Sequence, residues 1–199
     1  MRSRAVTNLI YAQLSFFFFL TIAILITTAG FSNNHGLSFY GEHLSTVIPF
    51  GTGFLVCDIF LLRAANALPK SQPPYKKIAL LLKILAVLLL LILLTPDTLN
   101  SFFDWSHIIA SFILFVFELT FAIWLTIRWY SDRLTWFLLS AQFLAGVLAM
   151  LSQFHIVYYL SEGIFFFQLL FGLFLIRSVS RLLERQRTSK HTTSQELYT

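Results

Sequence analysis

Charged side chains are scarce in this chain, and only one cysteine is present. Asp, Glu, Lys and Arg together make up 12% of the 199 residues, whereas 57% of the residues are hydrophobic and 23 are Phe. An ordinary soluble domain carries about twice that share of charge, so the composition excludes a typical water-soluble fold and indicates a membrane protein. The single Cys57 excludes a framework of disulfides within the chain.

Six apolar stretches approach the length needed to cross a bilayer. A helix needs about 20 apolar residues to span a hydrocarbon core about 30 Å thick. Polar breaks separate the expected spans, which lie at residues 9–29, 46–65, 78–94, 107–127, 134–151 and 163–176. The predicted fold class is therefore all-α: a polytopic membrane protein with a bundle of six transmembrane helices. The first span is too long for the apolar core of a signal peptide, so we expect it to remain as an anchor.

Lys and Arg are absent from three of the five loops that join the expected spans. Thirteen of the 14 basic residues lie at the N-terminus, in or beside the second and fourth loops, and after the sixth span; the other is Lys83, inside the third span. Basic residues collect on the cytoplasmic side of a membrane, so both termini are predicted to be cytoplasmic. The net charge of +5 then describes a cytoplasmic rim that faces anionic lipid headgroups, and no nucleic-acid surface is expected.

No separate soluble domain is indicated, and residues 1–176 are predicted to form one transmembrane domain. Residues 177–187 are predicted to be a basic amphipathic helix that leaves the bilayer and lies against the cytoplasmic headgroups. Its expected apolar side carries Val179, Leu182 and Leu183. Residues 188–199 have little to bury, so we expect a disordered cytoplasmic tail.

Two ionisable residues lie inside the expected spans, toward the cytoplasmic side. Asp58 lies five residues from Arg63, and Lys83 lies six residues from Lys77. At about 1.5 Å per residue, both are about 8 to 9 Å inside the boundary. Consecutive helices usually pack together, and a charge in hydrocarbon usually has a partner, so we predict an Asp58–Lys83 ion pair that fixes helix packing. In the alternatives, Lys83 extends to the interface and leaves Asp58 with hydroxyl groups or water, or Asp58 conducts protons or cations.

Four long polar side chains are expected at one depth, near the bilayer midplane. Gln13, Glu118, Gln142 and Gln168 each lie nine or ten residues from an Arg at the cytoplasmic boundary. That spacing places them about 14 to 15 Å into the membrane. Amides and a carboxyl at one depth can hydrogen-bond across helices, at about 0.6 to 2 kcal/mol per bond. A structural polar layer is one interpretation, and a proton-linked or polar-ligand site that uses Glu118 is the other.

The expected outer loops hold His and acidic residues. Imidazole and carboxylate groups can bind zinc or another divalent ion, or perform acid-base chemistry. The weak candidates for such a site are His35, His43, His107, His155, Glu42, Asp104 and Glu162. None of these His residues has HxxxH or HExxH spacing. Ordinary polar loops without basic residues explain the same pattern, so no cofactor is predicted and a divalent metal is the alternative.

One stretch, "GLSFYGEHLSTVIPFGTGF" at residues 36–54, joins an outer loop containing Ser and Gly to a Pro that leads into the second span. Pro49 can begin a helix without losing a needed hydrogen bond. The pattern resembles the six-helix DRAM/Frag-type families and related bacterial integral membrane proteins, over the first two spans. The resemblance implies a six-helix protein of a bacterial plasma membrane, and it transfers no catalytic residue.

Two classes of function are compatible with these residues. The first, which we favour, is a non-enzymatic integral membrane protein that binds lipid or a small ligand, or that belongs to a membrane complex. The second is a proton-linked transporter of small solutes that uses Glu118 and Asp58, or a membrane enzyme with a metal site among the outer His and acidic residues. A water-accessible cavity beside Glu118 would favour transport, whereas a dry, closed layer would be evidence against it.

Overall fold

The computed structural model describes residues 3–32, 36–69, 72–96, 101–129 and 132–196. Within them, six long helices have the length and composition of membrane spans. They are α1 (Arg4–Ile26), α4 (Val47–Ala67), α5 (Pro73–Leu94), α6 (Ser101–Trp129), α7 (Arg133–Gln153) and α8 (Leu160–Glu196). The short helices α2 (Ala29–Ser32) and α3 (Phe39–Glu42) lie between α1 and α4. The predicted all-α bundle of six spans is confirmed, and the chain is a multi-pass integral membrane protein.

A serine and two prolines, each just before an apolar span, set the starts of two helices. Ser3 caps α1, where its Oγ atom accepts a hydrogen bond from the Val6 backbone N–H at 3.3 Å. Pro73 and Pro74 occupy the first positions of α5, where a helix does not need the N–H that proline lacks. Both helices therefore begin five residues before the apolar spans from which they were predicted.

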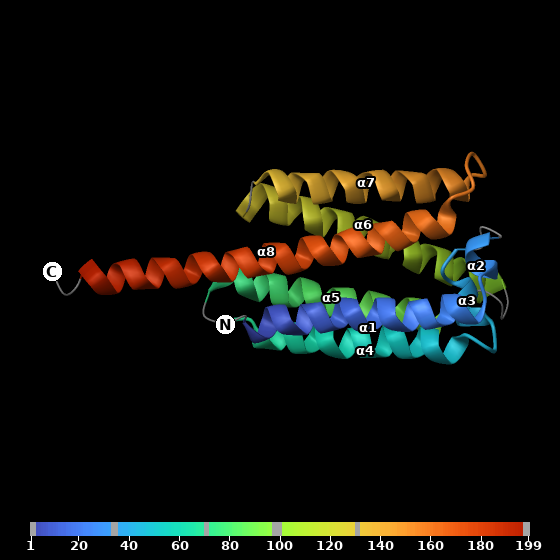
Figure 1. The fold of residues 1–199 in the computed structure, drawn as a ribbon, viewed down its shortest axis with the longest axis horizontal. Coiled ribbons are helices and arrows are strands. Elements are labelled where there is room, and N and C mark those ends of the chain that lie inside the picture. The colour runs from blue at the N-terminus through green and yellow to red at the C-terminus, as the bar shows by residue number, and fades with distance from the viewer. Residues whose placement is uncertain (1–2, 33–35, 70–71, 97–100, 130–131, 197–199) are drawn as a thin grey trace.

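The long helices form two groups of three. α1, α4 and α5 pack together as the first group, and α6, α7 and α8 form the second (Figure 1). α8 lies between α7 and α1, while α5 and α6 make a further contact between the groups. α4 and α5, which are neighbours in the sequence, pack side by side, as expected. The boundary between the two groups runs through the middle of the bundle.

α7 and α8 touch through their backbones at the end of the bundle where α8 begins. A Cβ atom built on Gly163 would lie 2.7 Å from the Ala149 backbone nitrogen and 2.9 Å from its Cα. Because these atoms belong to the backbone, a side chain at position 163 would push the helices apart. By contrast, a Cβ on Gly51 of α4 would meet Leu93 Cδ1 at 3.7 Å, an ordinary contact distance.

α8 continues to Glu196 and extends well past the neighbouring ends of α1, α5 and α7 (Figure 1). Residues 188–196, which were predicted to be disordered, are helical in the structure. The last part of the predicted tail, residues 197–199, lies outside the described residues. Residues 177–187 include Leu182, Leu183 and several Arg, which are good helix formers, and segment 188–196 continues this helix.

The apolar side of segment 177–187 packs on the bundle instead of facing lipid headgroups. Val179 and Leu182 are buried. The Tyr75 hydroxyl, near the start of α5, donates a hydrogen bond to the Leu182 carbonyl oxygen at 3.1 Å. Tyr75 of α5 therefore contacts this segment, whose Val179 and Leu182 side chains pack inside the bundle.

We expect Gly163→Ala to lower the free energy of unfolding by about 1 to 3 kcal/mol, because overpacking separates α7 from α8. Thermal unfolding of the purified protein in detergent, followed by circular dichroism, measures the change. Gly51→Ala is the matched control and should be neutral or stabilise by up to about 1 kcal/mol, because Ala favours a helix where there is room for it. Equal losses in the two variants would show that the contact at Gly163 is not special.

Candidate functional site

A small cavity lies inside the bundle, where the two helix groups meet. Its volume is about 40 Å³, and residues of α1, α4, α5, α6 and α8 line it. Its polar lining consists of Gln13, Cys57, Glu118 and Gln168, and the rest is apolar. The cavity has enough room for ordered water or for a compact solute of a few heavy atoms.

The polar side chains of the cavity form a hydrogen-bonded chain across three helices. Gln13 Nε2 on α1 donates to the backbone carbonyls of Gln168, at 3.4 Å, and Leu169, at 3.3 Å. Gln168 Nε2 on α8 in turn donates to Glu118 Oε2 on α6 at 2.9 Å. The structure thus brings together three of the four residues expected in the midplane layer. The chain also crosses the boundary between the two helix groups.

Gly172 makes room for the Gln13 side chain. A Cβ atom built on Gly172 would lie 1.8 Å from Gln13 Oε1, so the amide rests directly on the backbone of α8. This close approach lets Gln13 reach carbonyl groups on α8. The sequence alone did not point to Gly172 or to Cys57, because a single Gly or Cys in a transmembrane helix is common and carries no depth pattern of its own.

Glu118 is the ionisable residue of the cavity. Its side chain is 1% exposed and has the Gln168 amide as a hydrogen-bond donor. Carboxyl groups inside a membrane are rare and usually face a bundle interior or a water-filled cavity, where they mark ligand or proton sites. Glu118 has such a cavity beside it, and a bound solute could exchange a hydrogen bond or a proton with it.

Gln142, the fourth residue of the expected layer, does not line this cavity. Its side chain is 0% exposed, and within the described residues neither of its polar side-chain atoms has a hydrogen-bond partner. α7 packs on α8 on the side away from α1 (Figure 1). Gln142 has the expected spacing from the basic boundary, but it faces different neighbours. Three of the four residues predicted for the midplane layer are therefore joined, and Gln142 is apart from them.

The predicted ion pair between Asp58 and Lys83 does not form in the described part of the chain. Asp58 is 8% exposed, and its Oδ1 atom has no hydrogen-bond partner in the described part of the chain. Lys83 is exposed, although the preceding Leu82 is buried in the bundle. α4 and α5 do pack together, but Lys83 is on the outer face of α5. This arrangement corresponds to the alternative in which Lys83 extends to the interface.

The outer His and acidic residues do not gather at one point in the part of the structure that is described. No group of three His, Cys, Asp or Glu side chains there could hold a metal ion. The half-buried acidic candidates are Glu42, Asp104 and Glu162. His35 lies outside the described residues, so the weak metal hypothesis stays a prediction.

The other three outer His residues lie in different places and have different neighbours. His107 Nδ1 lies 2.7 Å from the Thr95 carbonyl oxygen, which joins the start of α6 to the end of α5. The His43 ring packs on the Phe39 ring, with their centroids 4.1 Å apart. His155 is exposed in the connection between α7 and α8. The contacts of His107 and His43 serve loop and helix packing.

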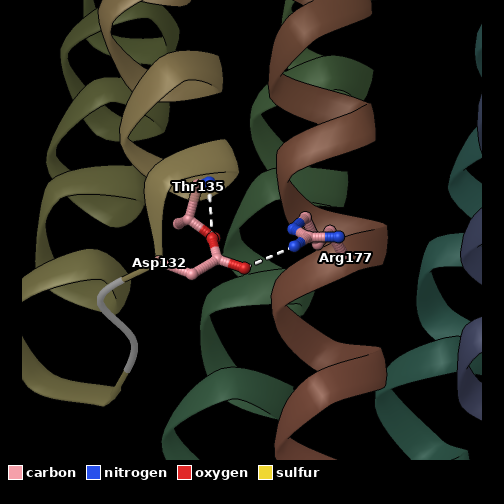
Figure 2. Close-up of polar contacts among 3 residues, drawn as sticks. All are labelled: Asp132, Thr135 and Arg177. Carbon is pink, nitrogen blue, oxygen red and sulfur yellow. Dashed lines mark hydrogen bonds and ion pairs between the residues drawn. The ribbon is translucent and has the colours of Figure 1, made fainter.

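Asp132 connects the start of α7 to α8. Its Oδ1 atom accepts a hydrogen bond from the Thr135 backbone N–H at 2.7 Å and so caps the helix, and its Oδ2 atom pairs with Arg177 Nη2 (Figure 2). Arg177 extends from α8 toward this cap. The signal for the cap is present in the sequence, since an Asp precedes the apolar run of α7. The choice of Arg177 as its partner depends on the packing of α8 beside α7.

No family model, no curated protein and no solved structure matches this chain. The resemblance of residues 36–54 to the DRAM/Frag-type families therefore stays a prediction. What the protein does must be inferred from its cavity and from the polar contacts around it.

We expect Gly172→Ala to lower the free energy of unfolding by about 1 to 3 kcal/mol, because the added methyl group collides with the Gln13 amide. Gln13→Ala in the same chain should recover most of that loss, since it removes the group that is struck. Thermal unfolding of wild type, both single variants and the double variant gives the coupling energy, which we expect at about 0.5 to 3 kcal/mol. Additive effects would mean that Gln13 does not rest on Gly172.

Proposed function

We propose that this protein is a non-enzymatic integral membrane protein that binds a small hydrogen-bonding solute between its two helix groups. The proposal rests on the central cavity, which is lined by Gln13, Glu118 and Gln168. These three residues come from three helices and from both helix groups. Membrane proteins that bind solutes commonly place the site near the bilayer midplane, between structural halves. The count of residues from the basic boundary supports that depth for all three side chains.

The chemistry of the lining favours a solute that both donates and accepts hydrogen bonds. Each Gln amide offers a donor and an acceptor, and Glu118 offers carboxyl oxygens. The remaining lining is apolar, so a solute must satisfy its polar groups at this one side of the cavity. A space of about 40 Å³ limits the solute to a few heavy atoms. We therefore propose a compact polar solute as the ligand.

Proton-linked transport of this solute is the second candidate function. Glu118 supports it, because a carboxyl beside a cavity can take up a proton with the solute and release it when the solute leaves. The buried Asp58 Oδ1, which has no partner in the described part of the chain, is a second acidic group in the bundle. Movement of one helix group against the other would expose the cavity to each side of the membrane in turn.

Binding can be tested with acetamide, formate and ammonium, which are compact neutral, anionic and cationic probes. We expect at least one probe to stabilise the purified wild-type protein against heat, by about 2.7 kcal/mol at a hundredfold excess over its Kd. Ala12→Val, which narrows the cavity at a lining position, should abolish this stabilisation. Asp58→Asn is the control, since Asp58 does not line the cavity, and should retain it.

The transport candidate has a separate readout in proteoliposomes that contain a pH-sensitive dye. A gradient of the stabilising probe should drive proton movement in wild type, while Glu118→Gln should bind the probe without moving protons. If wild type binds the probe but moves no protons, the transport candidate is wrong and the binding proposal stands. If no probe stabilises wild type more than Ala12→Val, the three polar residues serve only as a structural layer.

We infer that both termini are cytoplasmic and that the basic rim faces anionic headgroups, in a bacterial plasma membrane. The start of α1 and the end of α8 lie at the same end of the bundle (Figure 1), which supports a common side. The exclusion of Lys and Arg from the loops at the opposite end supports the cytoplasm as that side.

Single cysteines introduced in a Cys57→Ser background test this orientation. We expect a membrane-impermeant maleimide to label Leu44→Cys in intact cells, because Leu44 is 93% exposed between α3 and α4. Arg185→Cys, at an exposed position of α8, should be labelled only after the cells are opened. The reverse pattern would place both termini outside.

A further inference from the structure

A groove separate from the central cavity lies between the first turns of α1 and residues 173–184 of α8. Its volume is about 430 Å³, about ten times that of the central cavity. We propose that this groove binds one anionic phospholipid from the cytoplasmic leaflet. The proposal does not depend on a solute in the central cavity.

One part of the groove is apolar. Val6 and Ile10 line it from α1, and Leu173 and Ile176 line it from α8. Leu173 is 44% exposed, so this part opens sideways from the bundle. In a membrane-spanning helix pair, an apolar opening of this kind faces lipid, and an acyl chain fits it. A soluble anion would gain nothing from these four side chains.

The other part of the groove is polar and basic. Arg177, Ser180, Arg181 and Glu184 follow the apolar residues along the same face of α8. Leu173 and Arg181 are eight residues apart, so the lining changes from apolar to charged over about 12 Å. That order matches a phospholipid with its chains toward the membrane interior and its phosphate at the cytoplasmic boundary.

Two features favour a phosphate at the charged end. Arg177 is held in place by Asp132 through one of its nitrogens, while its buried Nε has no hydrogen-bond partner within the described residues. Arg181 follows one helical turn later in the same lining. Guanidinium groups bind phosphate oxygens through short, charge-assisted hydrogen bonds. Basic grooves between transmembrane helices on the cytoplasmic side are suited to anionic headgroups.

The balance of charge favours an anionic over a zwitterionic lipid. The groove lining holds two basic residues, Arg177 and Arg181, and one acidic residue, Glu184, which is an excess of one positive charge. A lipid with one net negative charge reduces that excess, whereas phosphatidylcholine does not.

The experiment titrates the purified full-length protein in detergent with phosphatidylglycerol or phosphatidylcholine of identical acyl chains, and native mass spectrometry counts the bound lipid. We expect wild type to bind phosphatidylglycerol more tightly. Arg181→Gln should weaken phosphatidylglycerol binding about fivefold, as expected for the loss of one arginine beside an anionic lipid. Arg185→Gln is the matched control, because it removes the same charge one turn away, outside the groove lining, and should change the affinity by less than about twofold.

Two further measurements test the occupant. Ile10→Trp fills the apolar part and should lower the affinity for phosphatidylglycerol without lowering thermal stability, which is recorded for every variant. Glycerol phosphate, the soluble headgroup alone, should not displace the lipid. Equal weakening by Arg181→Gln and Arg185→Gln would overturn the groove in favour of general attraction to the basic rim. Displacement by glycerol phosphate, or unchanged binding in Ile10→Trp, would overturn the lipid as its ligand.

Discussion

α8 packs on α7 within its own helix group and on α1 of the other group, and together with the contact of α5 and α6 it joins the two halves of the bundle. Gly163 lets α7 approach to backbone distance on one side, and Arg177 pairs with Asp132 at the start of α7. On the other side, the Gln13 amide of α1 rests on Gly172. Lipid tails are as apolar as the helices, so helix association in a membrane depends on close packing and on such hydrogen bonds. α8 supplies both kinds of contact.

The contact between α1 and α8 also contains both proposed binding sites. The cavity lies beside Gln13 and Gly172, and the groove lies beside Val6 and Ile10, about 5 to 10 Å further along α1. Both sites occur where the two helix groups meet. A lipid in the groove would touch the same two helices as a solute in the cavity. Movement of α1 against α8 would therefore affect both sites.

The six spans and the common level of the cavity residues along the bundle could be predicted because they depend on quantities that the chain carries along its own axis. Hydropathy and length identify a membrane span, and a constant rise per residue converts a count into a depth. Gln13, Glu118 and Gln168 were found in this way, and the structure joins them through hydrogen bonds. Gln142 has the same count but faces other neighbours, because depth says nothing of direction around a helix.

The sequence by itself determined that this is a six-span membrane protein with a basic end, and it determined which polar residues share a depth. Only the tertiary structure decided which of them meet. Lys83 lies on the outer face of α5 while Asp58 is buried, although both helices pack together. The rotation of each helix about its axis, and the choice of its neighbours, depend on close contacts such as that of Gln13 with Gly172. These contacts join residues far apart in the chain, so no local pattern contains them.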